Sequence, residues 1–143
     1  MATQNVDRLH QLAGATQVAE LHGTIRTARC GRCAQSAVIE QFLQNGTCTC
    51  GGHLRPDVVL FGEYLPEAAW DATLQAIQQA DVVLVIGTSL TVYPVNQLPT
   101  MTSGKLVYIN NEYTDVTASA YSFDAVLQGT AGDILQKIDS ATI

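Results

Sequence analysis

Apolar residues occur along this chain in short runs without polar alternation. Four runs stand out, at residues 57–61, 81–86, 105–109 and 125–127. A strand that is covered on both faces carries such a run, because neither of its faces meets water. The pattern therefore predicts a parallel sheet whose strands are covered on both faces, as in α/β proteins.

Segments between and beside these runs show the periodicity of helices. Residues 66–80 form the clearest case, because Pro66 suits a first helical turn and the apolar positions repeat on one face, at Trp70, Leu74 and Ile77. Shorter helices are expected at 5–14 and 132–138. A helix between the first two apolar runs predicts that those runs are neighbouring parallel strands joined by a right-handed crossover.

Composition narrows the class of protein. Hydrophobic residues make up 47% of the 143, which excludes intrinsic disorder, and the net charge of −6 argues against a nucleic-acid partner. An acidic surface suits a lysine-rich polypeptide instead. No apolar run is long enough to span a membrane, and no signal peptide opens the chain, so we expect a cytoplasmic protein without a membrane partner. Charged residues reach only 14%, which predicts that part of the surface faces more protein. An incomplete sheet would also let copies of the chain associate through its unpaired edge.

The four cysteines are confined to one short stretch, at Cys30, Cys33, Cys48 and Cys50. In a cytoplasmic chain, two close pairs at this separation favour one tetrahedral zinc over disulfides or unrelated buried thiols. Because the second pair is C-x-C rather than C-x-x-C, His53 stays open as a substitute ligand. Four protein ligands would make the zinc structural. The fold class is thus an open parallel Rossmann-like α/β sheet, incomplete at its N-terminal side, with a small zinc-ribbon-like insertion at 24–56.

Small and polar residues follow three of the predicted strands. They lie at 61–63, 87–89 and 110–111, and ligands of open α/β sheets bind outside the carboxyl ends of the strands. Glycine and hydroxyl groups at such an end suit phosphate or ribose, although an ordinary glycine turn would explain 87–89 equally well. His22 is a candidate general base because imidazole titrates near neutral pH, and a purely structural histidine is the alternative.

Five strings of residues, in this order and spacing, together resemble the sirtuins, which are NAD-dependent protein lysine deacylases. They are TQNVDRLH at 3–10, ELHG at 20–23, RPDVVLFGE at 55–63, GTSLTVYP at 87–94 and IN at 109–110. The cysteine pairs occupy the position of the family's zinc site. The resemblance extends from Thr3 to Ile138, which is essentially the whole chain.

The resemblance implies a role for each matching residue. His22 corresponds to the base that activates a ribose hydroxyl, after the acyl oxygen of the substrate lysine has displaced nicotinamide from NAD. The products are nicotinamide, the deacylated lysine and O-acyl-ADP-ribose. The implied NAD-binding residues are Gln4, Asn5, Asp7, Gly87, Thr88, Ser89, Asn110, Asn111 and Ala131. The implied contacts to acyl-lysine in a protein or peptide are Val58, Phe61, Gly62 and Glu63, and the zinc ligands are Cys30, Cys33, Cys48 and Cys50.

The chain also departs from the family pattern. It contains no counterpart of the glycine-rich GAG-x-S turn, nor of the PDFR loop that follows it. We therefore expect residues 1–143 to be the C-terminal portion of a sirtuin catalytic domain, with impaired activity in isolation. Two alternatives remain: a non-catalytic, zinc-stabilised remnant, and a protein ADP-ribosyltransferase.

Overall fold

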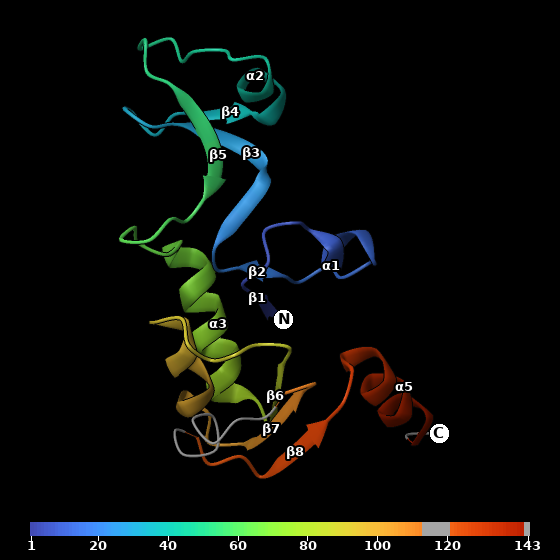
Figure 1. Cartoon of the computed structure of the whole chain (residues 1–143). Helices are drawn as coiled ribbons and strands as arrows, with labels where there is room; N and C mark the ends of the chain where they lie inside the picture. Colours follow the sequence, from blue (N-terminus) through green and yellow to red (C-terminus); the bar gives the residue numbers. More distant parts are fainter. Residues whose placement is uncertain (113–120, 142–143) are drawn as a thin grey trace. The chain divides into compact units, whose positions relative to one another are not determined.

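A computed structural model describes residues 1–112 and 121–141 of the chain (Figure 1). Contacts between residues divide it into two compact units, Met1–Thr73 and Leu74–Ile143. Each unit has its own sheets and is described by itself. In the described ranges, every helix is too short or too polar to cross a membrane.

The first unit begins with a small parallel sheet. Strand β1 (Ala2–Thr3) pairs with β2 (Ala19–Glu20), and the short helix α1 (Leu9–Leu12) lies between them in the sequence. The prediction of a helix over 5–14 is confirmed only for its centre. Asp7 accounts for the late start, because its carboxylate accepts the backbone N–H of Leu9 at 3.0 Å and holds the preceding residues in a turn.

The first unit also contains an antiparallel sheet in the order β4-β3-β5. Its elements are β3 (Gly23–Cys30), β4 (Ser36–Val38), helix α2 (Ile39–Leu43) and β5 (Leu54–Val58). Strand β3 is central and has a register shift between Thr24 and Ala28. The segment 24–56, which the sequence predicts as an insertion, runs from β3 to β5 and includes β4 and α2.

The predicted parallel strand at 57–61 is wrong. Its first residues belong to β5, which pairs antiparallel with β3, and the chain then leaves the sheet. Leu60 and Phe61 are exposed. An apolar run of this length does not distinguish a strand covered on both faces from a strand end followed by an apolar turn. The predicted crossover from 57–61 to 81–86 is therefore also wrong.

The second unit contains a parallel sheet in the order β6-β7-β8, as predicted from three of the four apolar runs. Its strands are β6 (Val82–Ile86), β7 (Lys105–Asn110) and β8 (Ala125–Gln128), with a 3-10 helix η1 (Val95–Met101) between the first two. Helix α5 (Ala131–Ala141) follows β8 and extends beyond the predicted range in both directions. Helix α3 (Glu67–Gln79) confirms the helix expected at 66–80 and contains the boundary between the units.

One face of the second unit's sheet forms a packed core. Val85, Leu90, Leu106 and Tyr108 are buried together, and the ring of Phe123 stacks on Tyr108 at a centroid distance of 4.9 Å. The opposite face of β6 is largely uncovered, since Val82, Leu84 and Ile86 are 52%, 43% and 37% exposed. The expectation that these strands are covered on both faces therefore fails for β6, which is also an edge strand of its sheet.

Candidate active site and metal centre

His22 is placed by the small parallel sheet and by the segment after β5. The N–H of Leu21 donates to the carbonyl of Thr3 at 2.9 Å, and the Leu21 side chain is only 2% exposed. The following residue, His22, is half-buried, and its carbonyl accepts the N–H of Val59 at 2.9 Å. The predicted base is therefore joined by its backbone to the stretch predicted to bind acyl-lysine.

The glycine after His22 is required by a close approach of two backbones. Gly23 has φ +73°, and a Cβ atom there would lie 2.1 Å from the carbonyl oxygen of Asp57 on β5. No side chain can be accommodated at that distance. The final glycine of the ELHG string therefore has a packing reason, because it allows β3 to start directly beside β5.

The residues predicted to hold the nicotinamide end of NAD lie on a loop that is tied to the same strand. The N–H of Asn5 donates to the Thr3 hydroxyl at 3.1 Å, and the carbonyl of Val6 accepts the N–H of Ile25 at 3.0 Å. Gln4 and Asp7 are half-buried, whereas Asn5 is exposed. The first unit thus brings this loop and His22 to the beginning of β3.

A tight turn carries the residues predicted to contact substrate. The N–H of Glu63 donates to the carbonyl of Leu60 at 3.0 Å, and Gly62 has φ +84°, the left-handed conformation that the third residue of a type II turn needs. Phe61, the second residue of the turn, is fully exposed. The turn therefore holds an aromatic ring in solvent.

Two arginines surround the carboxylate of Glu63. Its hydrogen bond with Arg55, the N–H of Leu60 and the nearby charge of Arg29 lower the pKa of Glu63 to about 2. The Glu63 carboxylate in turn raises the pKa of the Arg55 guanidinium. Both side chains are about one-third exposed or less, so the ion pair lies at the surface of the sheet and remains charged at neutral pH.

The carboxyl ends of β6, β7 and β8 meet at one edge of the second unit's sheet. The N–H of Gly87, the residue after β6, donates to the carbonyl of Ile109 at 2.9 Å, and the N–H of Gly129 donates to the carbonyl of Asn110 at 3.0 Å. Thr88 is half-buried, and Ser89 is exposed with its hydroxyl 2.8 Å from that of Thr91.

Hydrogen bonds made by Thr88 and Asn110, two of them partly buried, fix this edge. The carbonyl of Thr88 accepts the Tyr108 hydroxyl at 2.7 Å and the side-chain amide of Asn110 at 3.2 Å. The Asn110 side chain also accepts the N–H of Asn111 at 2.9 Å. Ala131, half-buried, is the first residue of α5. The residues predicted to hold the ADP-ribose half of NAD therefore gather within one unit: Gly87, Thr88, Ser89, Asn110, Asn111 and Ala131.

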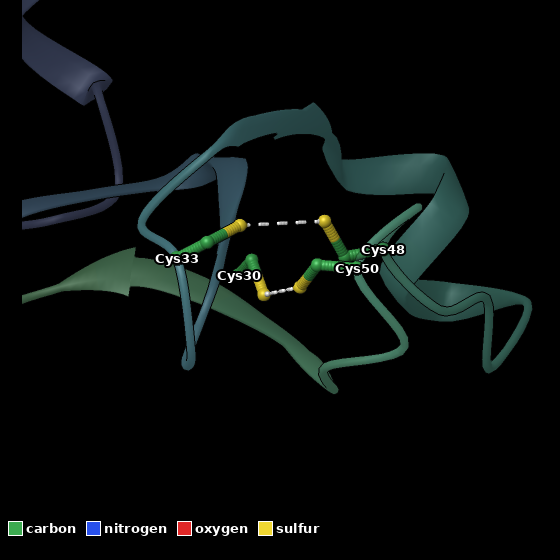
Figure 2. Close-up of side chains that lie close together, drawn as sticks. All are labelled: Cys30, Cys33, Cys48 and Cys50. Carbon is green, nitrogen blue, oxygen red and sulfur yellow. Dashed lines mark hydrogen bonds between the residues drawn. The ribbon is translucent and has the colours of Figure 1, made fainter.

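Four cysteine sulfurs converge between the β3–β4 connection and the loop before β5 (Figure 2). The sulfurs of Cys30 and Cys50 lie 3.5 Å apart, those of Cys33 and Cys48 lie 3.6 Å apart, and all four lie within 4.8 Å of one another. A tetrahedron with Zn–S bonds of about 2.3 Å has sulfurs about 3.8 Å apart. The donor set and its spacing fit one structural zinc ion. His53 is exposed and does not belong to the cluster.

The backbone around the cluster favours thiolates, which are the form that binds zinc. Backbone N–H groups of Cys33 and Arg32 lower the pKa of the Cys30 thiol to about 6. At Cys50, the N–H of Gly52 lowers the pKa, but the hydrogen bonds with the Cys33 and Cys30 sulfurs raise it to about 12. Sulfurs so close together cannot all be anionic without a cation, and zinc would supply that positive charge.

Two supporting residues were not singled out by the sequence. Gly52 is buried, and a Cβ atom there would lie 2.6 Å from the Cys30 sulfur and 3.3 Å from that of Cys50. Tyr108 is 1% exposed and holds the Thr88 carbonyl. For Gly52, its position in the sequence beside a cysteine pair is a signal that could have identified it. Tyrosine within an apolar strand gives no such signal for the second.

Comparison with known proteins agrees with this geometry. The family model described as "Sir2 family" matches residues 1–94. The chain is 48% identical to "NAD-dependent protein deacetylase 1" of Geobacillus kaustophilus, over 97% of the chain and 58% of that relative. It is 43% identical to "NAD-dependent protein deacylase 2" of Pyrobaculum aerophilum, over 95% of the chain and 56% of that relative. The chain thus spans a little over half the length of these relatives.

Solved structures give the same result for the fold. The structure titled "Sir2-p53 peptide-NAD+" matches with a TM-score of 0.88 at 31% identity, over 99% of the chain and 62% of that chain. "Sir2 bound to acetylated peptide" matches with a TM-score of 0.88 at 30% identity and the same coverage. With the motifs, the four-cysteine cluster and the α/β sheet all in agreement, the chain belongs to the Sir2 family, the sirtuins.

Proposed function

We propose that this chain is the C-terminal part of an NAD-dependent protein lysine deacylase. Acyl-lysine, NAD and water would give lysine, nicotinamide and O-acyl-ADP-ribose. The support is the family and the names of the relatives, which are deacetylases and deacylases. When bound, NAD supplies an anomeric carbon with nicotinamide as the leaving group.

The observation that carries the proposal is the position of His22. Its backbone carbonyl binds the N–H of Val59, and the loop with Asn5 and Asp7 is tied to the chain just beyond His22 through Val6 and Ile25. His22 would accept the proton of a ribose hydroxyl, and the loop would orient the nicotinamide ribose beside it. Holding the base between the two reactant-binding segments is the arrangement that general base catalysis requires.

The segment from Val58 to Glu63 would bind the acylated polypeptide. Its end is a turn with the ring of Phe61 fully exposed, which would pack against the acyl-lysine side chain. The backbone at Val58 and Gly62 would pair with an extended peptide by strand addition. The acidic net charge of −6 would favour lysine-rich partners.

The second unit would bind the ADP-ribose half of NAD. Gly87 leaves open space where a side chain would project, since a Cβ atom there would meet none of the described residues within 4 Å. The backbone beside it can therefore be approached closely by a phosphate or ribose. Ser89 and Asn111 are exposed at the same edge and would contribute polar groups.

The isolated 143 residues would be a poor enzyme. They contain no glycine-rich turn of the kind that holds the pyrophosphate of NAD. The edge strand β6 exposes Val82, Leu84 and Ile86, and an uncovered apolar edge promotes self-association. We therefore propose weak NAD binding and association between copies of this chain.

Nicotinamide release from NAD in the presence of an acetyl-lysine peptide tests the proposal. The assay compares the chain with a chimera that adds the preceding region of the Geobacillus kaustophilus relative. We expect turnover from the chimera only, and a loss of roughly 10²- to 10⁴-fold in its His22→Ala variant, the usual range for removal of a general base. The His53→Ala variant is the matched control, because His53 is exposed and lies outside the site.

Three results would contradict this function. Normal turnover by His22→Ala would remove the proposed base. ADP-ribosylated protein without deacylated lysine would indicate a transferase. A folded chimera that releases no nicotinamide would favour a non-catalytic, zinc-stabilised module.

A further inference from the structure

The carboxylate of Glu63 is the centre of a contact network in the first unit. Arg55 reaches it with both terminal nitrogens, one of them Nη2 at 3.1 Å, and Arg29 donates from Nη2 at 3.2 Å. The backbone N–H of Leu60 donates to the same carboxylate at 3.0 Å. One side chain thus joins two strands, β3 and β5, to the turn at 60–63.

Arg55 holds both ends of the segment predicted to bind substrate. Its Nη2 atom donates to the carbonyl of Val58 at 2.8 Å as well as to Glu63. Between these two points lies the turn that presents Phe61 to solvent. A planar guanidinium with several fixed donors suits this bridging role, because each hydrogen bond restricts the others.

The two arginines are directly opposite each other on neighbouring strands, since Arg29 pairs with Arg55 in the register of β3 and β5. Like charges in that position destabilise an antiparallel sheet. The nearby carboxylates offset the repulsion: Glu63 contacts both, and the Asp57 carboxylate lies 3.2 Å from Arg29. Strand pairing alone therefore gives no reason for this arginine pair, whereas holding Glu63 does.

We propose that Arg29 and Arg55 are positioning residues for the acyl-lysine substrate, which act through Glu63 to hold the turn at 60–63 in its binding conformation. This inference rests on the proposed deacylase function, because the acyl-lysine substrate of that reaction is the group that Phe61 on the turn would contact. A turn that is ordered before binding costs less conformational entropy when an extended peptide adds to it.

The experiment uses the full zinc-loaded chain and two measurements. Hydrogen exchange read by NMR reports the Leu60 and Glu63 amides, and fluorescence anisotropy reports the affinity for a labelled acetyl-lysine peptide. The variants are Arg55→Ala, Glu63→Ala and their double combination, with Arg55→Lys as the conservative change. Arg26→Ala is the control, because Arg26 lies on the same strand as Arg29 but outside the network. Zinc content and unfolding midpoint are measured for every variant.

We expect exchange of the Leu60 amide to accelerate about 10-fold or more in Glu63→Ala, since the carboxylate that accepts this N–H is removed. Peptide affinity should fall about 3- to 10-fold in each single variant, with no further loss in the double variant and partial rescue by Arg55→Lys. Arg26→Ala should match the unmodified chain in both measurements.

Unchanged exchange in Arg55→Ala and Glu63→Ala would overturn the proposal. Faster exchange with unchanged peptide affinity would overturn its link to substrate. If the unmodified chain binds no peptide while exchange responds as expected, the link to substrate is wrong and the network only orders the turn. The deacylase function itself is decided separately, by nicotinamide release from the chimera.

Discussion

Replacing Gly52 by alanine should weaken the zinc site more than any other alanine substitution of a glycine near it. The new Cβ would lie 2.6 Å from the Cys30 sulfur, 2.9 Å from the Arg32 Cβ and 3.3 Å from the Cys50 sulfur. Ordinary contacts between such atoms are roughly 3.5 Å or longer. At least one ligand must therefore move by about 1 Å, whereas metal–ligand distances tolerate only about 0.2 Å.

The expected loss in zinc affinity is about 10- to 100-fold, which is the range for changes just outside the ligand shell. A competition titration with a chromogenic chelator measures it. Gly31→Ala is the matched control, because a Cβ at Gly31 meets only the His53 carbonyl oxygen at 3.7 Å among the described residues, an ordinary contact. An affinity for Gly52→Ala within about two-fold of the unmodified chain, or equal losses in both variants, would refute the reasoning.

Three further predictions concern the second unit. Lys105 holds the pKa of Asp124 below its usual range. The pair therefore stabilises the fold at pH values above the usual pKa of an aspartate, and this stabilisation is lost as the pH falls through the lowered pKa of Asp124. A carbon-13 titration should show the low midpoint of Asp124, and Lys105→Ala should raise that midpoint. Tyr108→Phe should lower the free energy of unfolding by about 1–2 kcal/mol in chemical denaturation, because the Thr88 carbonyl loses a buried donor; no loss would be a contradiction. Leu84→Lys should reduce self-association in sedimentation velocity, since Leu84 is 43% exposed on β6, and oligomers that persist would exclude this face.

The sequence predicts best where chemistry and local spacing coincide. The cysteine pairs identify the metal centre because four possible ligands lie within 21 residues, from Cys30 to Cys50. Few structural features other than a metal site require four cysteines so close together in the sequence. The three strands of the second unit follow from apolar runs bounded by glycine and asparagine. In each case the signal is contained within one short segment.

The sequence predicts burial and strand pairing poorly where a residue's environment is set by distant parts of the chain. Val59, Leu60 and Phe61 extend an apolar run, yet two of them are exposed, because the Glu63 carboxylate and Gly62 turn the chain out of the sheet. The residues of β5 alone also do not indicate that β5 pairs antiparallel with β3. Pairing with β3 depends on Gly23, whose missing side chain admits the Asp57 carbonyl.

The alternation of side chains along β3 limits how this protein can change in length. Ala28 and Cys30 are buried at 1% and 2% exposure, and Arg29 between them points to the other face of the strand. Inserting or deleting one residue in β3 would exchange the two faces, so that a predicted zinc ligand and an arginine proposed to position the turn would be lost together. Insertions should instead be tolerated at the exposed turn of Gln44 and Asn45, which lies on neither face.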